Sequence, residues 1–269
     1  AGPDLFILRN DYAERNSSKV SAIPFANFSE EQFQNTFIEA AGPYVGPDGI
    51  RAVPFAADPL VLYLNRDMLS SAGFAKPPEF WDELYDMAAK ITKRDDTNSI
   101  QKSAVAFGEY TNVNHAKDIA ALLILQAGGR ITTRDSAGKL STSLVSRAGD
   151  TQQPSESALR FYTEFANPIK TYYSWNRALR ESRQMFATGD LALYIGLASE
   201  EPLIRRINPN LNFTAAPVPQ IRGGNRSLNV GYVYAFAVPK AGVNQQAALT
   251  VAYLLASQKP SQQLSEALG

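Results

Sequence analysis

The chain has 269 residues, of which 45% are hydrophobic and 19% charged, the composition of a globular protein with a substantial core. Its 26 Lys and Arg balance 26 Asp and Glu, so no net charge favours binding to nucleic acid or to an acidic membrane surface. Cysteine is absent, which excludes disulfides and thiolate chemistry.

Apolar runs and turn residues predict the elements of the first half in chain order. A buried strand lies at Asp4–Leu8, and Ser29 with Gln32 forms a capping box for a helix that runs toward Ala40. A buried strand or strand pair follows over 51–65. The remaining predicted elements are a short helix at 66–72, a helix at 81–92, a strand at 103–107 and a helix at 114–126.

The second half begins with a polar segment, 132–153, rich in Ser, Thr and Gly, which indicates a surface excursion or a crossing between lobes. We predict helices at 155–166, 176–187 and 201–207, a helical pair over 245–268, and strands near 191–195, 212–216 and 232–238. Alternating helices and strands are typical of α/β layers with mostly parallel sheets.

Catalytic residues are scarce. The single histidine, His115, excludes a zinc site of two histidines, and we interpret it as a structural residue. No nucleophile elbow and no phosphate-binding loop is found. Paired carboxylates remain, because glycoside hydrolysis needs only two of them, and Asp11, Asp58 and Glu109 are the candidates. We therefore keep a carbohydrate-active enzyme as an alternative.

Aromatic residues gather in the polar segment around Trp175, which follows Tyr172 and Tyr173. An exposed tryptophan at this place would favour a carbohydrate or a partner protein. Tyrosine pairs also occur in ferric-ion binders, but no convincing set of His or carboxylate ligands accompanies these residues. We expect no metal and no cofactor.

Residues 52–92, AVPFAADPLVLYLNRDMLSSAGFAKPPEFWDELYDMAAKIT, carry the clearest family pattern. Three further segments support it, AGPDLFI at 1–7, FATGDLALYIG at 186–196 and VGYVYAFAVPK at 230–240. The chain thus resembles the extracellular solute-binding proteins of sugar-type ABC importers, the family of maltose-binding protein. Each feature also has a plain structural role; for example, Trp81 and Leu84 supply core.

The resemblance implies an α/β, periplasmic-binding-protein-like, two-lobed fold with mixed, mostly parallel sheets sandwiched by helices. It implies that 1–62 belong to the N-terminal lobe, 63–225 mainly to the C-terminal lobe, and 226–269 to a returning strand and terminal helices. Relatives usually have more chain at both ends, so we expect a fragment whose signal segment lies outside the given sequence.

In such proteins a ligand is held between two lobes that close about a hinge. The positions carried over from the family are the following: Asn10, Asp11, Tyr12, Asp58, Glu109, Tyr110, Asn112, Ser199, Gly231 and Tyr232. Ser199 stands where relatives often present an aromatic platform, which makes simple maltodextrin stacking doubtful. Gly231 and Tyr232 are the expected compensation.

The resemblance predicts a monomeric, non-enzymatic receptor that delivers a small polar solute, most of all a sugar or oligosaccharide, to the permease subunits of an ABC transporter. It predicts a location outside the cytoplasm, in the periplasm or as a cell-surface lipoprotein. Besides the enzyme, a sensor or scaffold of the same fold without transport remains an alternative.

Overall fold

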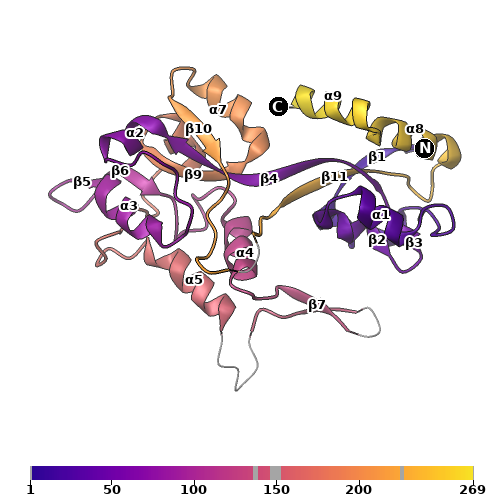
Figure 1. Ribbon diagram of the computed structural model, residues 1–269, viewed down its shortest axis with the longest axis horizontal. Coiled ribbons are helices and arrows are strands. Elements are labelled where there is room, and N and C mark those ends of the chain that lie inside the picture. Colours follow the sequence, from indigo (N-terminus) through magenta and orange to yellow (C-terminus); the bar gives the residue numbers. More distant parts are fainter. Residues whose placement is uncertain (1, 136–138, 146–152, 225–226, 269) are drawn as a thin grey trace. The chain divides into compact units, whose positions relative to one another are not determined.

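The computed structural model describes residues 2–135, 139–145, 153–224 and 227–268. Two compact units divide the chain: unit 1 comprises Ala1–Pro59 and Gly231–Gly269, and unit 2 comprises Leu60–Val230 (Figure 1). The chain therefore leaves unit 1 after Pro59 and returns to it at Gly231. At the unit 2 side of these crossings, the Leu60 N–H donates to the Val230 carbonyl over 2.9 Å.

Unit 1 contains a three-stranded sheet in which β11 (Gly231–Ala237) lies between β1 (Phe6–Arg9) and the first part of β4 (Val53–Asn65). Both pairings are antiparallel. The unit also holds α1 (Glu30–Thr36), α8 (Gln245–Ala256), α9 (Gln258–Leu268), the strand pair β2 (Val45–Gly46) and β3 (Gly49–Ile50), and 3-10 turns at Asn10–Tyr12, Ser17–Lys19 and Glu39–Tyr44.

The buried Tyr44 ties the sheet of unit 1 together. Its hydroxyl lies 2.8 Å from the Leu8 carbonyl of β1 and 2.6 Å from the Val233 carbonyl of β11. Burial raises the pKa of this phenol, so it stays protonated and can donate. The predicted capping box is confirmed, because Ser29 and Gln32 exchange side-chain and backbone hydrogen bonds at the start of α1.

Unit 2 is built on the second part of β4, which pairs with β9 (Leu191–Leu197) and with β10 (Phe213–Ala216). Beyond β9 follow β6 (Ile100–Val105) and β5 (Lys93–Arg94). The helices are α2 (Arg66–Ser71), α3 (Glu83–Ile91), α4 (Ala116–Gln126), α5 (Pro154–Glu164), α6 (Ser182–Ala187) and α7 (Glu201–Ile207), with a 3-10 turn at Ala198–Glu200.

The mixed α/β class is confirmed, but the expectation of mostly parallel sheets is wrong. Among the named strands of the described residues, β6 with β9 is the one parallel pair, and every other pairing is antiparallel. Helices do separate many strands along the sequence. However, the long β4 pairs antiparallel with β9, β10 and β11. The alternation of helices and strands along the sequence therefore did not determine strand direction.

Two local predictions also need correction or completion. The helix predicted at 176–187 begins only at Ser182, because the Asn176 side chain accepts the Ala178 N–H at 2.9 Å and forms a turn instead. The polar segment after Thr132 forms, where described, a hairpin of β7 (Thr132–Arg134) and β8 (Leu140–Thr142) within unit 2. Residues 136–138 and 146–152 of the predicted polar segment lie outside the described residues.

Aromatic rings fill the core of unit 2. Tyr63 of β4 stacks on Tyr194 of β9, with ring centroids 5.9 Å apart, and Phe186 and Phe213 pack around them. Such ring pairs add stability beyond the area they bury. Within the described residues, no helix has both the length and the apolar character to span a bilayer.

Candidate functional site

In unit 1, predicted site residues meet where neighbouring strands lie side by side. Tyr232 of β11 stands directly opposite Asp58 of β4, and Arg9 at the end of β1 stands opposite Tyr234 of β11. The Asn10–Tyr12 turn follows β1 at once. Asp58 is buried, whereas Asp11 and Tyr12 are exposed. The sheet therefore places the buried Asp58 beside Tyr232, while the exposed Asp11 and Tyr12 follow the end of β1.

Arg9 organises this cluster and was not among the residues predicted from the sequence. Its guanidinium donates hydrogen bonds to both carboxylate oxygens of Asp11, at 2.7 and 2.8 Å. The same group lies 4.0 Å from the centroid of the Tyr232 ring. The Asp11 hydrogen bonds outweigh burial and raise the pKa of Arg9 further above its ordinary value. These two hydrogen bonds fix the position of the Asp11 carboxylate, and the cation–π contact with Arg9 restrains the Tyr232 ring.

Asn10 joins the turn to the sheet. Its side-chain oxygen accepts the Val233 N–H at 3.2 Å and the Asp11 N–H at 3.1 Å. The position of Asn10 beside a strand end was predictable, but this bridge depends on β11, which is distant in sequence. Asn10 thus holds Asp11 in place beside Arg9.

Gly231 has a structural reason to be glycine. A Cβ at this position would lie 2.6 Å from both the Asp58 carbonyl oxygen and the Pro59 Cα, which are backbone atoms of the paired strand. We expect Gly231→Ala to separate β11 from β4 and to destabilise unit 1 by about 1–3 kcal/mol. Urea unfolding followed by far-UV circular dichroism would measure it. Gly42→Ala, where a Cβ meets nothing within 4 Å, is the control, and equal unfolding midpoints for both would contradict the argument.

In unit 2, Glu109 and Tyr110 lie on the loop that leaves β6. The Glu109 carboxylate accepts from Arg177 at 2.7 Å, and its carbonyl accepts the Tyr162 hydroxyl at 2.7 Å. Gly108 begins the loop with φ +93°, a left-handed conformation that favours glycine. Tyr110 is 75% exposed, so its ring is accessible in this unit.

Asn112 stabilises the same loop. Its amide nitrogen donates to the carbonyls of Asn176 and Leu179, each at 2.9 Å, and its oxygen accepts from the Trp175 indole at 3.1 Å. Trp175 is fully buried, so the condition under which it would favour a carbohydrate or a partner protein is not met. Its indole N–H donates to the partly buried Asn112, which is distant in sequence, so a sequence pattern cannot show this contact.

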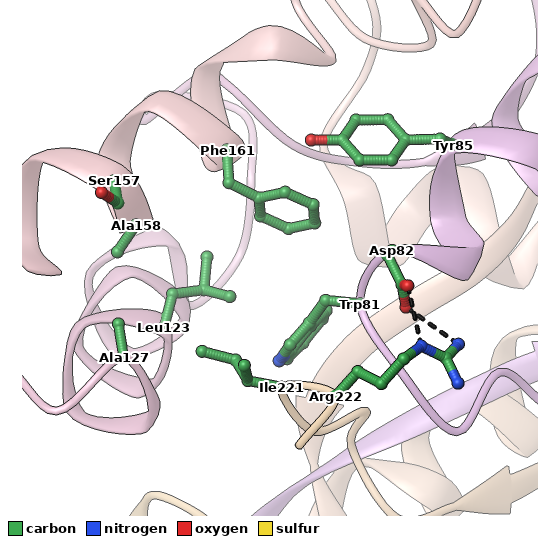
Figure 2. A pocket seen from close by; sticks show the side chains of 10 residues that line it. All are labelled: Trp81, Asp82, Tyr85, Leu123, Ala127, Ser157, Ala158, Phe161, Ile221 and Arg222. Carbon is green, nitrogen blue, oxygen red and sulfur yellow. Dashed lines mark hydrogen bonds and ion pairs between the residues drawn. The ribbon is translucent and has the colours of Figure 1, made fainter. Parts of the chain in front are cut away.

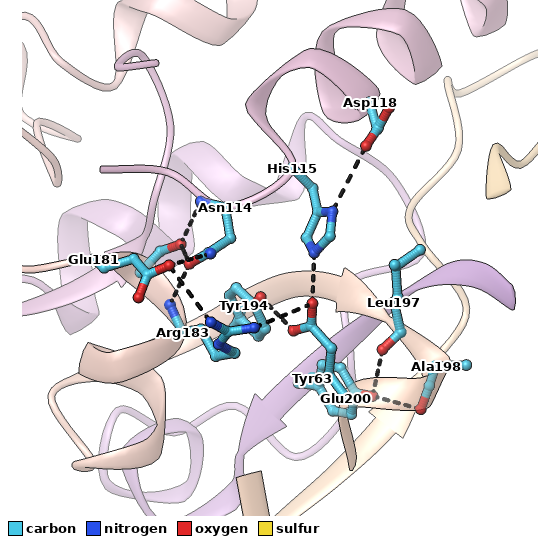
Figure 3. Close-up of polar contacts among 11 residues, drawn as sticks. Tyr63, Asn114, His115, Asp118, Glu181, Arg183, Tyr194, Leu197, Ala198 and Glu200 are labelled. Carbon is cyan, nitrogen blue, oxygen red and sulfur yellow. Dashed lines mark hydrogen bonds and ion pairs between the residues drawn. The ribbon is translucent and has the colours of Figure 1, made fainter. Parts of the chain in front are cut away.

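Ser199 lies exposed on the turn after β9, directly before Glu200. Glu200 belongs to a largely buried ionic network, which Figure 3 shows. Glu200 lies 2.5 Å from His115 Nε2 and accepts the Tyr194 hydroxyl at 2.5 Å, with Arg183 3.8 Å away. On its other side, His115 Nδ1 lies 3.6 Å from Asp118. The network therefore joins the loop that carries Glu109, Tyr110 and Asn112 to the turn that carries Ser199.

The network holds a proton on the histidine. Burial alone would lower the pKa of His115, but the hydrogen bonds to Asp118 and Glu200 outweigh it and raise the pKa to about 9. Burial opposes ionisation of Glu200 in the same way, and its bonds from His115 and Tyr194 nevertheless lower its pKa. His115 is therefore a structural cation, in agreement with its interpretation from the sequence.

Residues 1–260 match the family of bacterial extracellular solute-binding proteins. The chain belongs to this family. The resemblance predicted from the four sequence segments is thereby confirmed, and family membership implies a location outside the cytoplasm. Its members are binding proteins.

Solved structures agree with the family. A solute-binding protein of an ABC transporter from Thermotoga lettingae, bound with alpha-D-tagatose, superposes with a TM-score of 0.71 at 25% identity and covers 100% of this chain and 66% of that one. The GacH receptor of Streptomyces glaucescens, solved unliganded and with acarbose, gives a TM-score of 0.71 at 18% identity and covers 100% and 64%. The chain thus spans about two thirds of the length of these proteins, and the two-lobed fold class is confirmed.

A curated relative is similar over a shorter stretch. A chain named as a binding protein in Brucella abortus is 37% identical over 71 residues, which are 26% of this chain and 17% of that protein. The name of this relative, a binding protein, is consistent with the solute-binding family that the chain matches.

The part of unit 2 between α3, α4 and α5 holds a separate hollow of about 330 Å³, shown in Figure 2. Its lining includes Trp81, Tyr85 and Phe161. At its edge, the Arg222 guanidinium donates to the Asp82 carboxylate at 2.9 and 3.2 Å. None of the predicted site residues lines this hollow. Across the described residues, no three His, Asp or Glu side chains gather as a metal centre would need.

Proposed function

We propose that this chain is the substrate-binding component of an ABC transporter and that it binds a sugar or oligosaccharide. The family match over residues 1–260 carries the proposal. The cluster of unit 1 supports it, because ionised carboxylates accept hydrogen bonds from sugar hydroxyls and phenol rings pack against sugar faces. Delivery to permease subunits, a monomeric state, hinge closure and the choice between periplasm and lipid-anchored surface protein belong to the same proposal.

The proposed contacts are those predicted from the sequence, with revised roles. The proposed contacts in unit 1 are Asp11, Tyr12, Asp58 and Tyr232. Arg9 and Asn10 hold Asp11 in position. Gly231 allows β4 to approach β11 closely. In unit 2, Glu109, Tyr110 and Ser199 are proposed contacts, and Asn112 positions their loop. The proposed lobes are the predicted ones: 1–62 are part of the N-terminal lobe, 63–225 are mainly the C-terminal lobe with hinge crossings, and 226–269 are the strand that returns through the hinge region and the terminal helices.

A thermal-shift screen against neutral mono- and oligosaccharides tests the function. A ligand that binds the folded state alone raises the melting temperature, since at a hundred times the dissociation constant it adds about 2.7 kcal/mol of stability. We expect tagatose-like monosaccharides or acarbose-like oligosaccharides to produce such a shift. Absence of any shift across the panel, or glycan turnover that disappears in Asp58→Ala, would overturn the proposal.

Two substitutions test the contacts with the sugar found in that screen. Asp58→Ala and Tyr232→Ala should each weaken binding by at least about 1 kcal/mol, or roughly fivefold, the scale of a lost buried hydrogen bond or packed ring. Calorimetry measures the loss. Tyr232→Phe separates the hydroxyl from the ring, and Asp48→Ala, an exposed position elsewhere in unit 1, is the matched control. Unchanged affinity in both alanine variants would discard these contacts.

A further inference from the structure

A second concave surface of unit 2 is lined by basic and amide side chains. It encloses about 390 Å³ and lies among α2, the end of α3, the β5–β6 ladder and the 208–212 segment (Figure 1 labels these helices and strands). Its polar lining includes Asp67, Lys90, Lys93, Lys102, Asn210 and Asn212. None of the residues proposed for sugar binding lies in it.

Two of its lysines face each other across a strand pair. Lys93 of β5 and Lys102 of β6 are direct partners in the antiparallel register. Directly opposed residues have their Cβ atoms about 5 Å apart, and like charges at such positions destabilise a sheet. Among the described residues, no carboxylate forms an ion pair with either lysine. A bound anion between the two would turn this repulsion into attraction.

The acidic groups nearby are already engaged. Asp67, the one carboxylate that lines the described cavity, accepts the Asn212 amide at 2.6 Å, which fixes its position but leaves its negative charge in place. Lys93 and Lys102 together still outnumber this single carboxylate. The third lysine, Lys90, pairs with Asp86 at 2.8 Å one turn away on α3. Because the whole chain carries equal numbers of acidic and basic residues, this surplus of positive charge is local.

The amide side chains complete the set of donors. Asn208 anchors its segment, donating to the Ala187 carbonyl at 2.9 Å and accepting the Asn210 N–H at 3.1 Å. Asn210 follows on the exposed rim and lines the cavity. Two ammonium groups beside amide donors match the needs of a phosphate-type oxyanion, which carries several acceptor oxygens and close to two charges.

We infer that this cavity binds the phosphate group of a small soluble molecule, with Lys93 and Lys102 as its charge partners and Asn210 as a hydrogen-bond donor. The site is independent of the proposed sugar contacts. Its affinity depends on ionic strength, since both lysines are exposed and salt screens exposed charges.

Titration with inorganic phosphate and with glycerol 3-phosphate tests the site, using amide resonances of ¹⁵N-labelled full chain at constant ionic strength. We expect saturable shifts confined to residues around 90–93, 101–103 and 208–212, and at least tenfold weaker binding in the Lys93→Gln/Lys102→Gln double variant. Lys259→Gln, an exposed lysine in unit 1, is the control and should bind like the wild type. Tighter binding of glycerol 3-phosphate identifies a phosphorylated metabolite, and equal binding identifies free phosphate.

Shifts that fail to saturate, that spread over the surface, or that persist in the double variant would overturn the proposal. A second measurement uses Lys102→Glu, which replaces the opposed like charges by an attractive pair. This variant should melt at a higher temperature than the wild type in phosphate-free buffer and lose any stabilisation by phosphate. Stabilisation by phosphate equal to that of the wild type would also overturn the site.

Discussion

Trp175→Ala is expected to destabilise unit 2 by about 3–5 kcal/mol. Trp175 is fully buried, so its removal forfeits a large apolar contact area and leaves a cavity. The Asn112 side-chain oxygen also loses the indole donor that it holds at 3.1 Å. Urea unfolding measures the loss, and the remaining tryptophan, Trp81, lies in unit 2 as well, so its fluorescence reports on this unit.

Two variants separate burial from hydrogen bonding at this position. Trp175→Phe keeps much of the ring volume but removes the donor, and we expect it to fall between wild type and alanine. Tyr110→Ala removes a ring that is 75% exposed and should change stability by less than about 0.5 kcal/mol. If Trp175→Ala unfolds at the same urea concentration as Tyr110→Ala, the buried position of the indole is wrong.

Glu200→Ala is expected to cost unit 2 about 3 kcal/mol at neutral pH. The substitution removes one partner from a buried pair and leaves the His115 cation poorly compensated, which is more costly than never having formed the pair. It also leaves the buried Tyr194 hydroxyl without the acceptor it holds at 2.5 Å. Chemical unfolding monitored by tryptophan fluorescence gives the change in free energy.

The same network predicts how stability changes with pH. The folded state binds the His115 proton more tightly than the unfolded chain, since its pKa is raised from 6.5 to about 9. The resulting stability is fully present below pH 6.5 and is lost as the pH rises through about 9. The loss amounts to about 3 kcal/mol at most, reduced by solvent screening because the ring is not completely buried.

Glu200 has the opposite dependence. Its pKa is lowered on folding, so its contribution is present above the ordinary glutamate value of 4.5 and is lost as the pH falls through the folded value. The network therefore contributes most to folding stability between about pH 4.5 and 6.5. Unfolding free energies of the wild type should decline from pH 6.5 to 9, and His115→Gln should flatten that decline. An equal slope in both proteins would exclude His115 as its cause.

Local signals predicted the elements of this fold well, and long-range pairing much less. The capping box at Ser29 and the helix at Glu201–Ile207 depend on neighbours in sequence, and both occur where predicted. Strand direction depends on which distant strands join β4, so the parallel sheet inferred from alternation was wrong. The helix predicted from Asn176 failed for a local and a distant reason: the Asn176 side chain accepts the Ala178 N–H in a turn, and the distant Asn112 donates to the Asn176 carbonyl.

The candidate site shows the same division. Strand ends and family segments pointed to Asp11, Asp58 and Tyr232, which the sheet of unit 1 does bring together. Arg9 was missed, although a cation two residues before Asp11 was a usable signal, because its stacking on Tyr232 crosses from β1 to β11. Their roles as ligand contacts stay predictions.

The two chain crossings bear on the order in which the protein folds. Unit 2 is one continuous segment, whereas unit 1 needs β1 to find β11 across residues 60–230. Closing so long a loop in an unfolded chain is entropically costly and slow. Once unit 2 has folded, the hydrogen bonds of Leu60 with Val230 and Asn229 hold both crossings together. We therefore expect unit 2 to fold first and to bring Pro59 and Gly231, which are partners in the sheet of unit 1, close together before that sheet forms.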